Sequence, residues 1–471
     1  MIDLIFREYD IRGKVGSELN PDDVYDFARS LAYYFKQLNP ATQKIAVGMD
    51  GRTHSPHLKE KLCAGLLDSG LDILFLGICP SPALYFALHT LPVDAGVMIT
   101  ASHNPKEYNG FKICMGTTCV WGTQITQLRD LFKRRATLGA TTKGSIIESP
   151  IVDPYVTWLH DHFKQLVGLQ LPMVIDCANG AGAAVIPALI ERMEWPNAQM
   201  LCCTIDGSYP NHEADPTKKE NMRDVTHALA TTDAVLGIGL DGDADRMTPM
   251  TKSGRLVRGD ELLALFCKSV LEEFPNSSVI VDIKSSSALL ELITRWGGIP
   301  ILSPSGHAII KEEMKRTKAP IGGELSCHFI FADHYFGFDD AIYAFLRLLE
   351  LMRTTGRSLD ELLTIIPERF GSAEIRMPCP EEQKKRMIAA VKQFFAHQRD
   401  AEFNELDGVR VSMPYGWGIV RASNTQAMLS LRFEANTQDG LARIKKDFFY
   451  ALSPYFEPSF LYKYLELKDQ I

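Results

Sequence analysis

The chain has 471 residues, of which 46% are hydrophobic, so it is long enough for about three or four domains with sizeable cores. Its net charge of −8 and pI of about 5.9 give no support for nucleic-acid binding or for a basic membrane-binding surface. The chain contains no run of about 18 apolar residues, the length that spans a bilayer. The N-terminus lacks the basic region and the long apolar region of a signal peptide. The ten cysteines include no C-x-x-C pair, which favours reduced thiols in a cytoplasmic protein over a zinc site.

A strand that ends at an acid, followed by a small-residue loop and a helix, occurs three times. The strands end at Asp50, Asp176 and Asp282. The following helices are expected near 57–69, up to about 194, and up to 296. Strands that alternate with helices in this way predict α/β units. Three copies predict three similar mixed α/β domains.

The C-terminal part has a different pattern. A charged helix is expected over 380–398 and a strand over 409–411. Apolar and polar residues alternate over 427–433, with Ala427, Leu429, Leu431 and Phe433 on one face. This pattern predicts a half-buried antiparallel strand. The polar stretch 137–149 is expected to be a linker. We therefore predict four domains, over 1–150, 151–250, 251–367 and 368–471, of which the last is a smaller α+β domain with an antiparallel sheet.

Three carboxylates follow the apolar run 234–240: Asp241, Asp243 and Asp245. In an extended chain, alternate side chains point the same way, so the three anions would converge and repel unless a cation lies among them. Oxygen-only ligands suit Mg²⁺. A calcium loop would need Gly and Glu where Arg246 and Lys252 stand, so it is excluded. A solvated acidic turn is the alternative, and Arg246 favours an anion site instead.

Ser102 follows a strand-like run, 95–100, and precedes His-Asn-Pro, which would break a helix. Such an exposed serine could be a nucleophile or phosphate carrier, with Lys112 as a nearby base, although an ordinary turn serine gives the same pattern. Polar groups at alternate positions, Glu324, Ser326 and His328, could bind sugar hydroxyls, and His307 with Lys311 could do similar work. A phosphate could be held by Arg421, Ser423, Asn424 and Thr425, and by the N-terminal cluster Arg7, Tyr9 and Arg12. A polar loop, a capped turn and an ordinary basic surface are the alternatives for these three groups.

The order of the motifs is more specific than any single motif. Along the chain they are FREYDIRG, TASHNP, NGFK, DGDADR, GGELSCH, FGFDD and RASNT. In this order the chain resembles the α-D-phosphohexomutase superfamily, and most closely its bacterial phosphomannomutase/phosphoglucomutase branch, from end to end. The resemblance implies four domains around a central cleft, with a hinge near residue 367. It implies a Mg²⁺-dependent isomerase that interconverts hexose 1-phosphate and hexose 6-phosphate through a hexose 1,6-bisphosphate, with glucose 1,6-bisphosphate as primer.

The resemblance also assigns roles. Ser102 would be the phosphoserine, and Mg²⁺ would be held by a phosphoserine oxygen with Asp241, Asp243 and Asp245. Glu324, Ser326 and His328 match the sugar loop, and Arg421, Ser423, Asn424 and Thr425 match the loop for the non-transferred phosphate. Further active-site positions are Tyr9, Arg12, Lys112, Arg246, Lys284 and His307, and Lys112 and His328 are candidates for proton transfer.

Two positions depart from the family pattern. Cys327 stands where the family usually has Gly, and Gln426-Ala427 where it often has Glu-Pro. If residue 327 has a positive φ, its Cβ costs about 1 kcal/mol. Leu325 favours mannose and glucose phosphates as substrates. A phosphoglucosamine mutase, a non-catalytic sugar-phosphate sensor and a metal-dependent phosphatase are the alternatives, and the oligomeric state, monomer or dimer, is left open.

Overall fold

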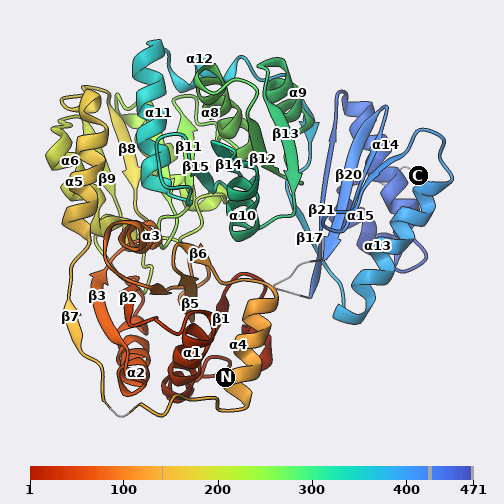
Figure 1. The fold of residues 1–471 in the computed structure, drawn as a ribbon. Helices are drawn as coiled ribbons and strands as arrows, with labels where there is room; N and C mark the ends of the chain where they lie inside the picture. Colours follow the sequence, from red (N-terminus) through yellow and green to blue (C-terminus); the bar gives the residue numbers. More distant parts are fainter. Residues whose placement is uncertain (141, 423–426, 468–471) are drawn as a thin grey trace.

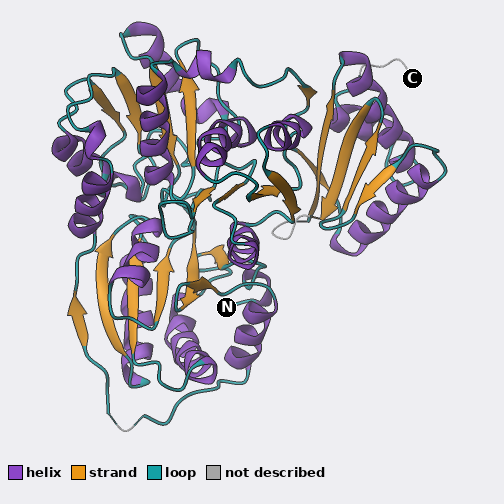
Figure 2. Cartoon of the chain, turned by 45° about the horizontal axis from the view of Figure 1, so that its top comes forward, coloured by secondary structure: helices purple, strands orange, loops and turns teal. Residues whose placement is uncertain are grey.

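The structure, a computed structural model, describes residues 1–140, 142–422 and 427–467. Four sheets with their helices make up the fold, and the fourth forms a separate lobe, coloured blue at the right of Figure 1 and seen again in Figure 2. Three sheets are mixed and the fourth is wholly antiparallel, so the predicted fold class is confirmed. In the part of the chain described, no helix has both the length and the apolar character that a membrane crossing needs.

The first sheet has the order β1-β5-β4-β2-β3-β7, with β6 paired to β5. Its parallel centre comes from the first copy of the predicted strand pattern. Ile45 and Val47 of β2 pack with α1 and α2, whereas Ala46 of the same strand faces the core that contains α3. The elements are η1 (Asp3–Ile5), β1 (Ile11–Lys14), η2 (Pro21–Asp23), α1 (Val24–Leu38), β2 (Lys44–Met49), α2 (Ser55–Asp68), β3 (Asp72–Ile78), α3 (Ser81–Thr90), β4 (Ala95–Ile99), β5 (Tyr108–Met115), β6 (Thr118–Cys119), α4 (Thr123–Lys133) and β7 (Ile146–Glu148).

The second and third sheets repeat one plan. Each has three parallel strands and one antiparallel edge strand, in the orders β11-β10-β8-β9 and β13-β12-β14-β15. The second set of elements is α5 (Val152–His162), η3 (Lys164–Leu166), β8 (Met173–Asp176), η4 (Ala181–Ala184), α6 (Ile186–Met193), β9 (Ala198–Leu201), η5 (Lys219–Met222), α7 (Arg223–Thr231), β10 (Leu236–Leu240) and β11 (Met247–Thr251). The third is α8 (Gly259–Glu273), β12 (Ser278–Asp282), α9 (Ser287–Arg295), β13 (Ile299–Ser303), α10 (His307–Thr317), β14 (Ile321–Gly323), β15 (Phe329–Phe331), α11 (Ala341–Thr355) and α12 (Leu359–Leu363).

The C-terminal lobe, residues 370–467, has the strand order β16-β21-β20-β19-β18, with β17 also paired to β21. Its elements are β16 (Phe370–Gly371), β17 (Ile375–Pro378), α13 (Glu381–Ala396), β18 (Glu402–Asn404), β19 (Val409–Met413), β20 (Gly416–Ala422), β21 (Met428–Ala435), α14 (Gln438–Leu452) and α15 (Pro458–Leu465).

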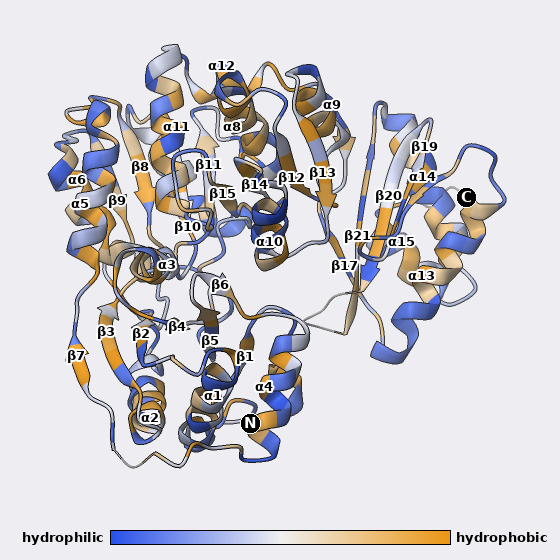
Figure 3. Cartoon of the chain, viewed as in Figure 1, coloured by the Kyte–Doolittle hydropathy of each residue, from blue (hydrophilic) through white to orange (hydrophobic). Residues whose placement is uncertain are grey.

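The cores follow the same division. One apolar cluster runs through the first three sheets, from Ala46 to Leu363, whereas the lobe has a cluster of its own, from Ile375 to Leu465. In Figure 3 the hydrophobic colour gathers on strands such as β3, β8 and β13, and the outer helices carry hydrophilic positions. Apart from a small cluster of Ile283 with Trp417 and Ile419, the lobe therefore shares no apolar core with the other three sheets among the residues described.

Two local expectations were wrong. The stretch 137–149 contains strand β7, because Ile146–Glu148 pairs in parallel with Ile73–Phe75 at the sheet edge. Strand β21 is buried on both faces: Leu431 and Phe433 face the lobe's core, and Arg432 and Glu434 are 2% and 1% exposed. The second face is buried because its charged groups pack against α8 and the loop after β12, where Arg432 lies 3.0 Å from Asp260 of α8 and donates to the Lys284 carbonyl.

Candidate functional site

Loops from all four sheets meet at one cleft of about 270 Å³. The Ser102 loop follows β4, the Asp241–Arg246 loop joins β10 to β11, and the Glu324–His328 loop joins β14 to β15. The sequence-predicted residues that line the cleft are Arg7, Tyr9, Arg12, Ser102, Lys112, Asp245, Arg246, Lys284, His307, Glu324, Ser326, His328 and Arg421. Asp241 and Asp243 lie behind this wall, and Ser423, Asn424 and Thr425 fall outside the described residues.

The Ser102 loop is held by a buried arginine that the sequence analysis did not single out. Arg52 donates to the carbonyls of Ser102 (2.7 Å), Asn104 (2.6 Å), Pro105 (2.8 Å) and Tyr108 (3.0 Å). Its charge is balanced by Asp50 at 3.2 Å. Ser102 itself has a φ of 50°, a left-handed conformation that costs a side-chain-bearing residue energy and is typical of functional turns. The arginine thus fixes a strained turn that presents one hydroxyl.

The three aspartates converge as predicted, but for another reason. Their ligand oxygens lie within 4.8 Å of one another. Residues 241–246 form a turn rather than extended chain, with Ala244 at a φ of 54° and the amides of Asp245 and Arg246 donating to Asp241 Oδ1. The turn, not strand alternation, therefore gathers the carboxylates.

Two cations offset part of the negative charge of this cluster. Lys112 Nζ lies 2.6 Å from Asp243 Oδ2 and 2.5 Å from Asp245 Oδ2, and Arg246 Nε lies 3.1 Å from Asp241 Oδ2. Burial alone would lower the pKa of Lys112, but the two carboxylates raise it above its ordinary value. Burial and the neighbouring charge of Asp245 raise the pKa of Asp241 to about 7. The cluster is thus a buried site with crowded negative charge.

The donor set fits a hard divalent cation. Asp243 Oδ1 and Asp245 Oδ1 are buried and accept no hydrogen bond, although His328 lies 3.3 Å from the latter. Ser102 Oγ donates to Asp241 Oδ2 at 2.8 Å, so the hydroxyl adjoins the cluster. Oxygen-only ligands with unused lone pairs are what Mg²⁺ prefers.

The loop Glu324–His328 places its polar groups on the cleft, at a cost. Cys327 has a φ of 70°, so the condition under which its Cβ costs about 1 kcal/mol is met. His328 Nδ1 lies 3.0 Å from Glu324 Oε2, and its Nε2 lies 3.3 Å from Asp245 Oδ1. Burial disfavours the imidazolium, but Asp245 and Glu324 raise the pKa of His328 to about 10. His328 is therefore a cation at neutral pH.

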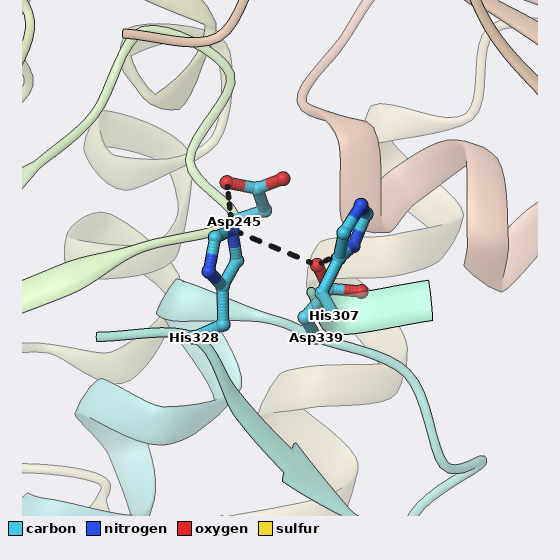
Figure 4. A group of neighbouring side chains, drawn as sticks. All are labelled: Asp245, His307, His328 and Asp339. Carbon is cyan, nitrogen blue, oxygen red and sulfur yellow. Dashed lines mark hydrogen bonds and ion pairs between the residues drawn. The ribbon is translucent and has the colours of Figure 1, made fainter. Parts of the chain in front are cut away.

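A second histidine and a further aspartate extend this cluster, as Figure 4 shows. Asp339 Oδ2 lies 2.6 Å from His307 Nδ1 and 4.0 Å from His328 Nε2, and the two imidazole rings stack at 5.2 Å. Asp339 Oδ1 accepts from Lys311 at 2.8 Å. Despite burial, the contacts with His307 and Lys311 hold the pKa of Asp339 well below its usual range. Asp339 thus orients two cleft histidines from behind.

The opposite wall carries cations that have anionic or carbonyl partners. Lys284 Nζ lies 3.4 Å from Glu374 Oε1, and Arg421 Nε donates to Asp407 Oδ2 at 2.8 Å. Arg12 donates to Asn104 Oδ1 at 2.9 Å, and the Tyr9 hydroxyl donates to the Ser305 carbonyl. Arg246 Nη2 is buried and unpartnered. The wall as a whole suits a phosphate that bridges several donors.

The sequence analysis missed the groups that position others. These are Arg52, His103, Asp339, Glu374 and Asp407. Asp339 stood within FGFDD and His103 within TASHNP, so two motifs already contained a signal. His103 Nδ1 lies 3.1 Å from Ser102 Oγ, and burial together with Arg246 and Arg12 lowers the pKa of His103 well below its ordinary value. It is a neutral imidazole beside the serine.

Four protein-family models match successive parts of the chain. They are described as phosphoglucomutase/phosphomannomutase alpha/beta/alpha domains I, II and III, over 3–136, 153–254 and 258–370, and the C-terminal domain, over 374–451. The chain belongs to the phosphoglucomutase/phosphomannomutase family. It is therefore an enzyme of an isomerase family, and a small-molecule sugar phosphate is the kind of substrate that this family implies.

Individual relatives agree with this assignment. The chain is 39% identical to the phosphomannomutase/phosphoglucomutase of Pseudomonas aeruginosa, with 94% of each chain covered. It is 39% identical to a phosphoglucomutase of Neisseria gonorrhoeae, covering 94% of this chain and 95% of the other. A crystal structure of a family protein from Burkholderia thailandensis superposes with a TM-score of 0.89 at 33% identity, covering 96% of this chain and 98% of that one. These relatives support a hexose phosphate mutase activity.

Proposed function

We propose that the protein interconverts hexose 1-phosphate and hexose 6-phosphate, with mannose or glucose as the sugar, through a phosphoserine at Ser102 and a hexose 1,6-bisphosphate. The observation that carries this proposal is the 2.8 Å hydrogen bond from Ser102 Oγ to Asp241 Oδ2, at the edge of a three-carboxylate cluster facing a cation-lined cleft. A serine that carries phosphate needs both a metal site and cations for the phosphoryl charge.

Each step has residues to perform it. The bond from phosphorus to Ser102 Oγ breaks while a sugar hydroxyl bonds to phosphorus, and the bisphosphate then turns over and returns its other phosphoryl group to Ser102. The hydroxyl's proton must leave and the serine oxygen must be reprotonated on release. Lys112 and His328 remain the candidates for these transfers, and neutral His103 at 3.1 Å from Ser102 Oγ joins them.

The binding roles follow from position. Glu324 and Ser326, with His307 and His328, face the sugar, and Arg12, Lys284 and Arg421, with Tyr9, face the phosphate that does not react. Ser423, Asn424 and Thr425 are proposed to complete that phosphate site. Asp241, Asp243 and Asp245 would hold Mg²⁺, which would supply positive charge to the transferring phosphoryl oxygens. Arg246, with its unpartnered Nη2, would add to that charge.

Three further expectations belong to the proposal: the domain boundaries, the primer and the cellular location. The domain boundaries near 150, 250 and 367 are supported by the separate sheets, and glucose 1,6-bisphosphate is expected to prime an unphosphorylated Ser102. A cytoplasmic location is supported by the ten cysteines, which are all free thiols in the structure.

The test is ³¹P NMR of the protein with Mg²⁺ and a trace of glucose 1,6-bisphosphate, given the 1-phosphates of mannose, glucose or glucosamine in separate tubes. A growing 6-phosphate signal that disappears in Ser102→Ala supports the proposal, and the rate order identifies the sugar. Fastest conversion of the glucosamine ester would favour a phosphoglucosamine mutase. Free phosphate would indicate a phosphatase, and no conversion at all would indicate a sugar-phosphate-binding protein.

A further inference from the structure

A pair of thiols lies on a short hairpin behind the cleft. Cys114 of β5 and Cys119 of β6 are direct cross-strand partners, and their Sγ atoms are 3.5 Å apart. The neighbouring pair carries the hydrogen bond, from Val120 N to Ile113 O at 2.8 Å. Cys114 and Cys119 therefore occupy a non-hydrogen-bonded pair, the type in which facing side chains lie closest.

Cys119 also has a cation beside it. Lys311 Nζ donates to Cys119 Sγ at 3.1 Å and lies 4.3 Å from the centre of the Tyr85 ring. The thiol of Cys114 donates a hydrogen bond to Cys119, and this bond, against the opposing effect of burial and together with the Lys311 charge, lowers the pKa of Cys119 well below its ordinary value. By contrast, burial raises the pKa of Cys79 to about 12. A thiolate stabilised by a cation is the reactive form of cysteine.

The position of Cys119 gives small molecules access to it. It lines a second cavity of about 1100 Å³, between α3, the β5–β6 hairpin, α10 and residues 332–338. Cys119 is partly exposed, whereas Cys114 is fully buried. This cavity is separate from the catalytic cleft, because the two share no lining residue among those described. A reagent in it meets the Cys119 sulfur first and finds Cys114 behind it.

We propose that Cys119 is an oxidation site for small hydroperoxides and that Cys114 is its resolving thiol. The Cys119 thiolate attacks the peroxide, the O–O bond breaks, and Cys119 becomes a sulfenic acid as hydroxide or alkoxide leaves. The Cys114 sulfur then attacks Cys119 Sγ, the S–O bond breaks, and water leaves as the disulfide forms. Two thiol electrons from each pair thus reduce one peroxide.

The modification would reach the cleft through one side chain. Lys311 has two anionic partners, the Cys119 thiolate and Asp339 Oδ1, and Asp339 Oδ2 holds His307. Oxidation removes the first anion, so Asp339 becomes the remaining counter-charge of Lys311 among these contacts. Cys119 is thereby linked to the cleft histidines through Lys311 and Asp339.

A second thiol pair supplies an internal contrast. Cys177 Sγ and Cys203 Sγ are closer, at 2.9 Å, but the pKa of Cys177 is raised well above its ordinary value, first by burial and then by Cys203. If separation governs oxidation, this pair reacts first. If the cation-stabilised thiolate governs it, Cys114 and Cys119 react first.

The experiment treats the reduced full-length protein with equimolar hydrogen peroxide, blocks free thiols with N-ethylmaleimide and identifies peptides without reduction. One tryptic peptide, 113–129, contains both cysteines, so the disulfide appears as that peptide with neither thiol blocked. We expect it before any Cys177–Cys203 product. Prior oxidation of the Cys177 pair, or Cys119 reacting no faster than the other cysteines, would overturn the proposal.

Variants separate the two steps. In Cys114→Ser, Cys119 should stop at the sulfenic acid and be trapped by dimedone. Lys311→Met should slow the oxidation about tenfold, while Lys315→Met, at an exposed lysine of the same cavity, should leave it unchanged. An unchanged rate in a folded Lys311→Met protein contradicts the proposal. If that variant does not fold, absence of dimedone adduct on Cys119 in Cys114→Ser contradicts it independently.

Discussion

At the scale of single residues, Cys327 carries backbone strain into the sugar loop. Its φ of 70° lies in the left-handed region, where a Cβ costs roughly 1–2 kcal/mol. Cys327→Ala and Cys327→Gly both remove the thiol, but only glycine removes the Cβ. After the greater freedom of unfolded glycine is subtracted, we expect the glycine variant to be more stable than the alanine variant by about 1 kcal/mol. Chemical denaturation of the two proteins measures this, and an alanine variant of equal or greater stability would show that the loop is not strained.

Lys112 is the residue on which the metal-free cluster depends. Without it, Asp243 and Asp245 lose the cation within 2.6 Å of both. Breaking a buried pair in this way costs about 3–5 kcal/mol. We expect Lys112→Met to melt well below the wild type in EDTA and to gain more from Mg²⁺ than the wild type does, because the metal would replace the missing charge.

Thermal melting with and without Mg²⁺ checks this prediction, with Lys106→Met, at an exposed lysine near the Ser102 loop, as the control. A metal-dependent rise in Tm that is equal in wild type and Lys112→Met would mean that the lysine and the metal do not compete for the same carboxylates.

At the scale of elements, the loop after β4 keeps its shape through Arg52. The guanidinium makes four hydrogen bonds to loop carbonyls and an ion pair with Asp50, all from one planar group. A lysine keeps the charge but has no fork of donors. We expect Arg52→Lys to retain the fold while kcat falls about tenfold or more, since a misplaced nucleophile loses its alignment. Arg52→Met should lose about 3–5 kcal/mol of stability as well.

The measurement is kcat by a coupled mutase assay alongside the thermal melting temperature. Arg29→Lys, at a residue of α1 outside the cleft lining, is the matched control and should change neither value. An Arg52→Lys enzyme with wild-type kcat would show that the loop holds its turn without the fork.

The elements also show what the sequence could and could not predict. Apolar runs ending at Asp50, Asp176 and Asp282 gave the three sheets, because local periodicity survives in the fold. Arg52 was missed because the carbonyls that it contacts lie about fifty residues away, and no local pattern records such contacts. Asp339 stood within FGFDD, but the motif does not show that its partners lie in other parts of the chain. The two-sided burial of β21 was missed for the same reason: its outer face depends on another sheet, not on its own alternation.

At the scale of the whole molecule, the C-terminal lobe meets the third sheet through a largely polar interface. Arg410 donates to the carbonyls of Ile283 (2.5 Å) and Ser285 (3.1 Å), and Glu434 accepts from Ser287. The apolar contribution found here is a small cluster, Ile283 with Trp417 and Ile419. Polar interfaces between domains favour relative motion. Such motion suits a proposed cleft that must release and rebind a sugar turned end for end.

One buried ion pair makes this interface sensitive to acid. Asp260 of α8 lies 3.0 Å from Arg432 of β21. Burial would raise the pKa of Asp260, but Arg432 and Arg258 lower it to about 2. A lowered folded-state pKa gives stability that is present above the ordinary value near 3.8 and is lost as the pH falls toward 2. The pair should therefore contribute about 2 kcal/mol at neutral pH that disappears over this window.

We expect Asp260→Asn to be less stable than the wild type at pH 7, because the buried Arg432 then loses its nearer anion and keeps only Glu434 at 3.9 Å. The difference between the two proteins should shrink as the pH falls from 4 to 2, since the wild-type carboxylate becomes neutral there as well. Unfolding in urea is followed by the fluorescence of the five tryptophans, of which Trp417 lies at the interface with Arg410 3.7 Å from its ring centre. Asp224→Asn, at a half-exposed acid of α7, should show no such pH dependence. A gap between wild type and Asp260→Asn that stays constant from pH 7 to pH 2 would mean that the ion pair does not hold the lobe.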